Sequence, residues 1–200
     1  MGNKVTVKTA LLIAGFEGGS LKAYKDVVDR WTWGIGITRA TGFDVLQYKN
    51  KESSVMEVAR VFIDVLEKKY APAVRKVFLG YKLTEEQFAA ALSFHYNTGA
   101  IAKASWIKAF KEGNMKEARR RFMLYKKPKQ VIPRRRKECV LFFDGEWPTL
   151  GRVPFYTVNT NYRINWKVVK RIDMTAVFEH LLGKKKVVKK IPWWRRWFNV

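Results

Sequence analysis

The sequence predicts a mostly helical α+β domain with one small β-hairpin. Apolar residues recur at helical intervals in several segments, whereas the stretch over residues 24–38 is rich in aromatic and β-branched residues and contains two glycines. Hydrophobic residues make up 48% of the 200-residue chain, which is ample for one buried core. We therefore expect one globular domain, or one domain with an appendage, built mainly from helices.

The first predicted helix ends at Glu17. Helical spacing relates its apolar residues, which are Val7, Leu11, Leu12 and Phe16. Gly18 and Gly19 follow directly, and a glycine just past the last periodic residue signals a helix C-terminus. At that end, the partial negative charge of the helix and burial both favour the neutral, protonated form of a carboxyl group. Glu17 is therefore a candidate general acid.

The predicted hairpin over residues 24–38 brings in a second carboxylate. Residues 27–30 form its turn, so Asp26 and Thr32 are expected to face each other across that turn. A carboxylate near an apolar helix end and another in a polar turn suit cleavage of a glycosidic bond, because one protonates the leaving oxygen and the other directs a water molecule. The spacing alone leaves a second interpretation open, in which both carboxylates are solvated caps.

Further helices follow the hairpin. Helical spacing predicts them over residues 55–70, 73–78, 88–96 and 115–126, and a last one opens at Pro133. Pro72 is expected to break the first of these from the second. Residues 84–87 form a capping box for the most apolar helix, which we expect to be the core helix. His95 lies in that helix and is expected to be structural, or a hydrogen-bonding group facing a cleft, rather than a catalytic base.

Charge and cysteine content narrow the function classes. The 40 Lys and Arg residues against 17 Asp and Glu give a net charge of +23, which predicts attraction to polyanions such as nucleic acid, anionic lipid or the acidic bacterial envelope. The single cysteine, Cys139, excludes an internal disulfide. With only His95 and His180 beside it, no Cys/His zinc set can be assembled, and no metal is expected. Cys139 itself is expected to be a small buried apolar residue rather than a nucleophile.

The N-terminal segment gives no clear targeting signal. Lys4 and Lys8 precede an apolar run over residues 10–16, but this run is at the short limit for a signal peptide, lacks a clean small-residue cleavage site and leads directly into Glu17. No stretch approaches the ~18 to 20 apolar residues needed to span a bilayer. We therefore expect synthesis in the cytoplasm without a signal peptide.

Several short motifs resemble those of the phage-type lysozymes, the muramidase endolysins of tailed phages. The first is a Glu, an Asp nine residues later and a Thr six residues beyond it, in a frame close to "EG…L.aY.D…..T.G.G", on which Glu17, Asp26 and Thr32 fall. Residues 91–99 resemble a second motif, "AL.SF.fN.G", and the segment that starts at Ser105 resembles a third. Residues 134–142 resemble the pattern "RR..E..LF" near the end of the catalytic domain. The resemblance covers residues 5–146, with Ile37 at a position where many members carry His.

This resemblance implies a fold and a reaction. The fold would be lysozyme-like, with a small β-hairpin lobe, a helical lobe and a glycan cleft between them. A monomeric, cofactor-free enzyme would hydrolyse the β-1,4 bond between N-acetylmuramic acid and N-acetylglucosamine in peptidoglycan. Glu17 would be the general acid, Asp26 the base or charge stabiliser, and Thr32 would help to position the water. In that family an arginine reaches the catalytic Glu, and Arg135 is the candidate here. The other expected supporting or substrate-binding residues are Arg134, His95, Asn97 and Ser105.

The composition changes from Trp147 onward, which predicts a catalytic domain over residues 1–146 and an extension over 147–200. Gly151 to Trp166 suggests extended segments that pack back on the enzyme, followed by a short helix that ends at Gly183. Residues 184–200 contain seven Lys and Arg, no acid and four large aromatic residues. This composition fits a segment that lies on an anionic membrane surface, and a solubilising tail is the alternative.

Three functions remain to be separated. The lysozyme interpretation places the action at the cell wall, with holin-dependent export. A lytic transglycosylase would also need one acid, but its product ends in an anhydro sugar and it has no use for a water held by Asp26, so product mass separates the two. A cationic, membrane-permeabilising envelope-binding protein would still kill cells as a Glu17→Gln variant. Specific nucleic-acid binding is not expected, because no readout motif accompanies the charge.

Overall fold

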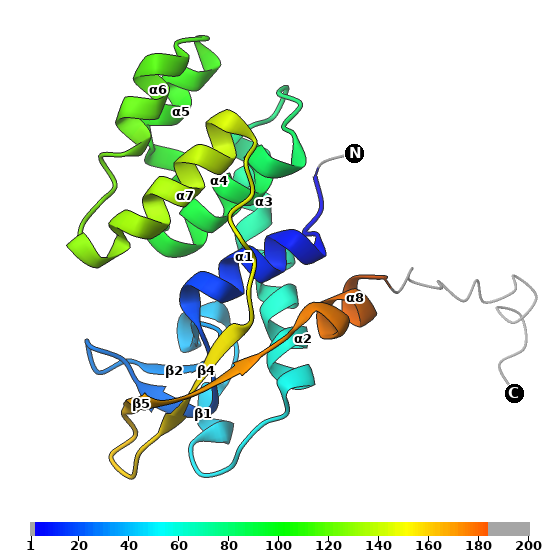
Figure 1. Cartoon of the computed structure of the whole chain (residues 1–200), viewed down its shortest axis with the longest axis vertical. Helices are drawn as coiled ribbons and strands as arrows, with labels where there is room; N and C mark the ends of the chain where they lie inside the picture. Colours follow the sequence, from blue (N-terminus) through cyan, green and yellow to red (C-terminus); the bar gives the residue numbers. More distant parts are fainter. Residues whose placement is uncertain (1–2, 184–200) are drawn as a thin grey trace, which may run out of the picture.

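Residues 3–183 are described in the computed structural model, which has a helical lobe at one end and a β lobe at the other (Figure 1). The α-helices of this part are α1 (Val7–Glu17), α2 (Val55–Val65), α3 (Ala71–Val77), α4 (Glu85–Thr98), α5 (Ser105–Lys111), α6 (Met115–Phe122), α7 (Ile132–Asp144) and α8 (Thr175–Gly183). Its strands are β1 (Ser20–Lys25), β2 (Trp31–Gly34), β3 (Ile37–Thr38), β4 (Val153–Val158) and β5 (Ile164–Ile172). Figure 1 shows α1 between the two lobes, and this helix contacts both α4 and β4. None of the described helices has the length and apolar character needed to cross a membrane.

The sheet of the β lobe has the strand order β1-β2-β3, with antiparallel neighbours. The hairpin predicted over residues 24–38 is present, and the structure lengthens its first strand and adds β3. One expectation is wrong, because Asp26 and Thr32 do not face each other. The register pairs Thr32 with Tyr24, and Asp26 lies past the end of β1, where its N–H donates to the carbonyl of Arg30 at 2.9 Å.

An aromatic stack forms the core of the β lobe. The indole of Trp33 is fully buried and lies nearly parallel to the rings of Phe43 and Tyr48, with ring centroids 5.1 Å and 4.3 Å away. Its Nε1–H is not left unpaired, since it lies within hydrogen-bond distance of the carbonyl of Leu21 and the hydroxyl of Ser53. Burial of a large ring with a satisfied polar atom fixes β2 against β1 and the following loop.

The chain stays helical through Pro72, where a break was expected. A π-helical turn (Leu66–Tyr70) continues α2, and α3 starts at Ala71 with Pro72 in its first turn. Proline is tolerated there because the first N–H groups of a helix have no intrahelical acceptor. The wider π-helical turn absorbs the change of direction. It also carries Tyr70 to within 4.6 Å, centroid to centroid, of the ring of Tyr96 on α4.

The helical lobe is packed around aromatic rings from four helices. α4 begins with the predicted capping box, in which residues 84 and 87 exchange side chain to backbone hydrogen bonds. Trp106 of α5 is fully buried, with its ring centroid 5.6 Å from that of Phe94 on α4 and 4.9 Å from those of Phe122 on α6 and Phe142 on α7. These contacts set the position of α7 beside α4.

The segment after α7 forms extended strands that pack back on the domain, as predicted, and the structure places them on the β lobe. β4 and β5 form an antiparallel hairpin. α8 packs against α1 and α2 and buries the ring of Phe178. β4 also joins the start of β1, since Gly19 donates to the carbonyl of Pro154 at 2.8 Å and accepts from the N–H of Tyr156 at 2.9 Å. The boundary between residues 146 and 147 remains a prediction. Residues 184–200, for which membrane contact was predicted, lie outside the described residues.

Candidate active site

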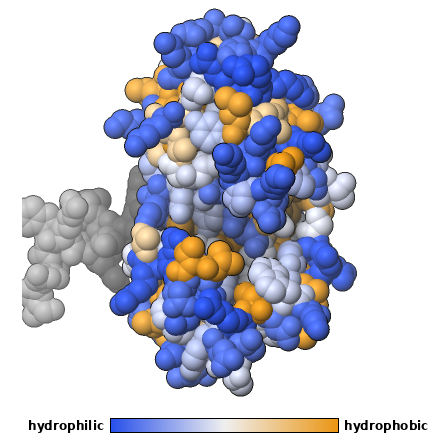
Figure 2. Space-filling model, turned by 90° about the vertical axis from the view of Figure 1, so that its left-hand side faces the viewer, coloured by the Kyte–Doolittle hydropathy of each residue, from blue (hydrophilic) through white to orange (hydrophobic). Residues whose placement is uncertain are grey.

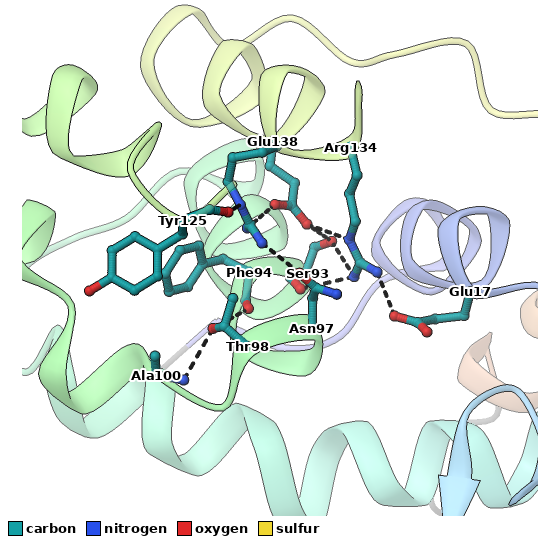
Figure 3. Close-up of polar contacts among 10 residues, drawn as sticks. Glu17, Ser93, Phe94, Asn97, Thr98, Ala100, Tyr125, Arg134 and Glu138 are labelled. Carbon is teal, nitrogen blue, oxygen red and sulfur yellow. Dashed lines mark hydrogen bonds and ion pairs between the residues drawn. The ribbon is translucent and has the colours of Figure 1, made fainter. Parts of the chain in front are cut away.

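Glu17 ends α1, and one arginine holds its carboxylate. The N–H of Gly18 donates to the carbonyl of Ala14 at 2.9 Å and closes the helix at the predicted residue. The Glu17 side chain is 23% exposed, and its Oε1 accepts a hydrogen bond from Nη1 of Arg134 at 2.5 Å (Figure 3). The carboxylate can therefore be reached from solvent while its direction is fixed.

Arg134 is itself held by α4 and by its own helix. Its Nε donates to Oε1 of the fully buried Glu138 at 2.8 Å, and its Nη2 lies 3.0 Å from the carbonyl and 3.2 Å from the hydroxyl of Ser93. The Ser93 hydroxyl also donates to Glu138 at 2.5 Å. Figure 3 shows this chain of contacts running from α7 across α4 to the end of α1. Because charge-assisted bonds at fixed angles orient a side chain strongly, the guanidinium of Arg134 is a rigid support for Glu17.

Arg135 does not reach Glu17, contrary to the expectation from sequence. Its guanidinium donates to the carboxylate of Glu138, to the side-chain oxygen of Asn97 at 2.6 Å and to the carbonyl of Tyr125 at 2.9 Å. Neighbouring residues of an α-helix point roughly 100° apart, so only one of two adjacent arginines on α7 can face α1. Arg135 instead ties α7 to the C-terminal part of α4.

The two arginines have different electrostatic environments. Burial alone would lower the pKa of Arg134, but the carboxylates of Glu17 and Glu138 outweigh it and raise that pKa above its usual value. Burial lowers the pKa of Arg135. The carboxylate of Glu138 opposes this change, and the cation of Arg134 lowers the pKa further. Arginine stays protonated in proteins under ordinary conditions, so both side chains act as fixed cations.

Three tyrosines lie in the electrostatic neighbourhood of the Glu17 carboxylate. Burial raises the pKa values of Tyr24, Tyr70 and Tyr96, and the charge of Glu17 raises all three further. The hydroxyl of Tyr96 donates to a backbone carbonyl of the β lobe at 2.5 Å. A side-chain carbon at Gly36, which has a φ of +68°, would lie 3.2 Å from that hydroxyl and 3.6 Å from Oε2 of Glu17. Gly36 is thus the position that lets the β lobe approach the carboxylate closely.

Asp26 lies at the other end of β1, in the turn before β2. Its Oδ1 accepts from the N–H groups of Val28 at 3.0 Å and Arg30 at 2.9 Å, which makes an Asx-type turn. Its Oδ2 is 3.5 Å from Nε of Arg30, and its side chain is 26% exposed. Burial and the charges of Glu17 and Asp26 together raise the pKa of Tyr24, which stands between the two carboxylates along β1. No hydrogen bond or ion pair joins Glu17 directly to Asp26 in residues 3–183.

Thr32 lies on β2 and is 4% exposed. Its hydroxyl is 3.3 Å from the carbonyl of Arg30, which also accepts the N–H of Asp26. The side chain is therefore linked to the Asp26 turn through a shared backbone carbonyl and not through the carboxylate.

The remaining predicted residues fall into separate surroundings. His95 follows the buried half of α4, with its ring 5.4 Å from that of Tyr70; burial lowers its pKa and favours the neutral form. Its Nδ1 is buried without a hydrogen-bond partner among the described residues. Asn97 is exposed on α4 and accepts from Arg135. Ser105 starts α5 and lines a groove with residues of α3, apart from the Glu17 network.

Sequence analysis assigned no role to Glu138 and Ser93, which complete the support of Arg134. The spacing gave part of the signal, because arginines three and four positions before a glutamate on a helix predict ion pairs with it, although not their burial. Cys139 is buried, as predicted, and burial raises the pKa of its thiol, which disfavours the nucleophilic thiolate.

A recess marks the junction of the two lobes. Figure 2 shows the face at the left of Figure 1, hollowed at mid-height, with hydrophilic side chains predominating above and below.

No group of three or more His, Cys, Asp or Glu side chains that could hold a metal ion occurs within the described part of the chain.

Comparison with solved structures shows that the fold is of the lysozyme type. The endolysin from Escherichia coli O157:H7 phage FAHEc1 superimposes with a TM-score of 0.66 at 23% sequence identity, covering 74% of this chain and 99% of that one. In sequence, the chain is 28% identical to the endolysin of Bacillus phage B103 over 70% of its own length, and it spans only 54% of the length of that relative. It is also 28% identical to the endolysin of Acyrthosiphon pisum secondary endosymbiont phage 1, covering 69% of this chain and 97% of the relative.

The family model of the phage lysozymes matches residues 14–138, more than half of the chain. The chain therefore belongs to the phage lysozyme family. The match includes the end of α1, the β1-β2-β3 sheet, α4 and the first half of α7, and stops before the β4-β5 hairpin.

Proposed function

We propose that this protein is an endolysin that hydrolyses the β-1,4 bond between N-acetylmuramic acid and N-acetylglucosamine in bacterial peptidoglycan. The observation that carries the proposal is the Glu17 carboxylate at the end of α1, partly exposed and held by the buried Arg134. Its place in a family of lysozymes supports the same reaction class.

In this proposal Glu17 is the general acid that protonates the glycosidic oxygen. The hydrogen bond from Arg134 occupies Oε1, so Oε2 is the oxygen that would carry the proton to the leaving group. Arg134 fixes the direction of the Glu17 carboxyl group in this scheme, and correct positioning of a reacting group accounts for a large part of the rate in such reactions.

Asp26 is proposed to direct the attacking water from the turn that follows β1. Two backbone N–H groups already occupy its Oδ1, so Oδ2 is the oxygen available to a water molecule. Thr32 would support the same water by holding the turn or, after a rotation of its hydroxyl, by direct contact. His95 and Asn97 would act as supporting residues on α4, with Asn97 held by Arg135, and Ser105 would bind glycan only in the separate groove beside α3. The scheme uses only side chains of this chain, without a cofactor, in a monomer.

The test is lysis of permeabilised Gram-negative cells and of purified peptidoglycan by a Glu17→Gln variant. We expect a loss of about 10²–10⁴-fold in a variant that still folds, because general acid catalysis contributes that much and the amide cannot supply the proton. Glu179→Gln is the matched control, since Glu179 is an exposed glutamate on α8 and should keep full activity. Retention of a tenth of the activity by Glu17→Gln would refute the assignment.

Product analysis separates the proposal from lytic transglycosylation. Mass spectrometry of soluble muropeptides should show reducing N-acetylmuramic acid ends that have gained one water. Products that end in the anhydro sugar would instead identify a transglycosylase. Killing of cells by Glu17→Gln at the rate of the parent protein would favour membrane permeabilisation by the cationic chain as the main activity.

A further inference from the structure

The β4-β5 hairpin lies outside the residues matched by the family model, and its turn contacts the turn that carries Asp26. The carbonyl of Tyr162 accepts the N–H of Lys25 at 2.7 Å. The ring of Tyr162 packs edge-on against Trp31 with centroids 5.2 Å apart, so it covers the other strand next to the same turn. Tyr162 has a φ of 57°, a conformation that few residues with side chains adopt, and this conformation is closed by a hydrogen bond from its N–H to Asn159.

Arg163 extends this contact into the turn itself. Its Nη1 donates to the backbone carbonyl of Asp26 at 2.6 Å, and its Nη2 donates to Oδ1 of Asp29 at 2.6 Å. Asp29 also accepts from Lys25 at 2.9 Å through its other oxygen and has a φ of 62°. A planar guanidinium thus bridges the first and fourth residues of the turn over residues 26–29 at fixed geometry.

The tip of this turn has little other support. Val27 is 95% exposed and Val28 is 64% exposed, so no packing core holds them. The remaining contacts of the turn are local hydrogen bonds and ion pairs among residues 25–30. A turn with exposed tips and local hydrogen bonds is expected to open easily, and a long-range bridge from another hairpin restricts such opening.

We infer that Arg163 is a positioning residue for Asp26, and that the β4-β5 hairpin completes the catalytic turn. This inference rests on the proposed role of Asp26. Arg163 touches the backbone of Asp26 and the side chain of Asp29, and makes no contact with Oδ2 of Asp26, which lies 3.5 Å from Nε of Arg30. It acts by fixing the direction of the carboxylate, so its loss should lower the rate of the chemical step and leave glycan affinity nearly unchanged.

The experiment compares Arg163→Gln, Arg163→Lys and the control Arg171→Gln in the full chain. Arg171 is an exposed arginine of β5 on the same hairpin, so its substitution removes the same charge without touching the turn. We expect Arg163→Gln to lower kcat on soluble peptidoglycan fragments by about 10-fold with KM within about 2-fold, since a small misplacement of a reacting group costs rate and not affinity. The Arg163→Lys variant keeps one of the two contacts and should fall between Arg163→Gln and the parent protein.

Hydrogen exchange without substrate provides the structural readout. The amides of Asp26 and Arg30 should exchange about 10-fold faster in Arg163→Gln, while amides of α4 stay unchanged. The contact between Lys25 and Tyr162 remains in this variant, so the hairpin is expected to stay folded. If exchange in the turn of Arg163→Gln is unchanged, the inference is wrong. The inference is also wrong if exchange is faster in Arg163→Gln but its kcat is unaltered, provided that Asp26→Asn is inactive. Full activity of Asp26→Asn would refute the proposed role of Asp26 and with it the catalytic part of the inference, and the exchange data would still report whether Arg163 holds the turn.

Discussion

Replacement of Arg134 by glutamine tests the buried network that supports Glu17. Arg134→Gln removes the contacts to Glu17 at 2.5 Å and to Glu138 at 2.8 Å. Hydrogen bonds to charged groups contribute about 1.5–3 kcal/mol each. Glu138 keeps Arg135 and Ser93 as partners, and water can reach the 23% exposed Glu17, so we place the loss near the low end for two such contacts.

The expected destabilisation is about 3 kcal/mol, at the low end of the cost of breaking a buried ion pair by removal of one partner. For a chain of this size that corresponds to a fall in melting temperature of about 6–12 °C. Activity on soluble fragments should fall by about 10²-fold, because the carboxylate of Glu17 loses its fixed direction. Arg134→Lys keeps the cation without the planar fork and should recover part of both losses.

Differential scanning calorimetry and a fragment assay measure these effects, with Arg136→Gln as the control. Arg136 is the next but one residue on α7 and is exposed, so it should change neither quantity. If Arg134→Gln melts within a degree or so of the Arg136 control and keeps its activity, the network does not hold Glu17 and the reasoning fails.

Three further predictions follow from the structure and the sequence. Asp26→Asn should be severely impaired on purified peptidoglycan while Thr32→Ala loses less, since Thr32 contacts the turn and not the carboxylate; a near-normal rate for Asp26→Asn would point to a transglycosylase. Burial raises the pKa of Tyr24, so the neutral side chain contributes stability that is fully present below the ordinary tyrosine pKa near 10. This contribution should be lost as the pH rises from about 10 toward the raised pKa. Melting temperatures of Tyr24→Phe should therefore decline less at alkaline pH than those of the parent protein. Deletion of residues 184–200 should reduce binding to anionic vesicles and lysis of whole cells, less so at high salt, and leave hydrolysis of soluble fragments unchanged; lost activity on soluble fragments would contradict this.

Local rules predicted the elements that carry the carboxylates. The spacing of apolar residues and the glycine pair placed the end of α1 at Glu17, because the helix and its cap are determined within one turn of sequence. The capping box of α4 was predicted for the same reason. Pro72 was misinterpreted as a break, because the sequence gives no sign that a π-helical turn precedes it and adjusts the helix direction.

Long-range contacts could not be predicted from local rules. Arg134 and Arg135 have the same chemistry, and the choice between them depends on the rotation of α7 about its axis, which the aromatic core around Trp106 sets. The register that places Tyr24 rather than Asp26 opposite Thr32 depends on how many residues the turn takes up. The contact of Arg163 with the turn was beyond reach, because only the folded hairpin brings it to Asp26.

The separation in sequence between the proposed catalytic groups and their supports has a consequence for synthesis on the ribosome. Glu17 meets Arg134 across 117 positions, and the backbone of Asp26 meets Arg163 across 137 positions. A nascent chain that has exposed α1 and the whole β lobe carries both carboxylates but neither of the arginines that orient them. Loops of this length close late, after the residues between them have been made. Growing chains should therefore stay catalytically silent until most of the polypeptide has emerged, and activity should appear late and abruptly during translation.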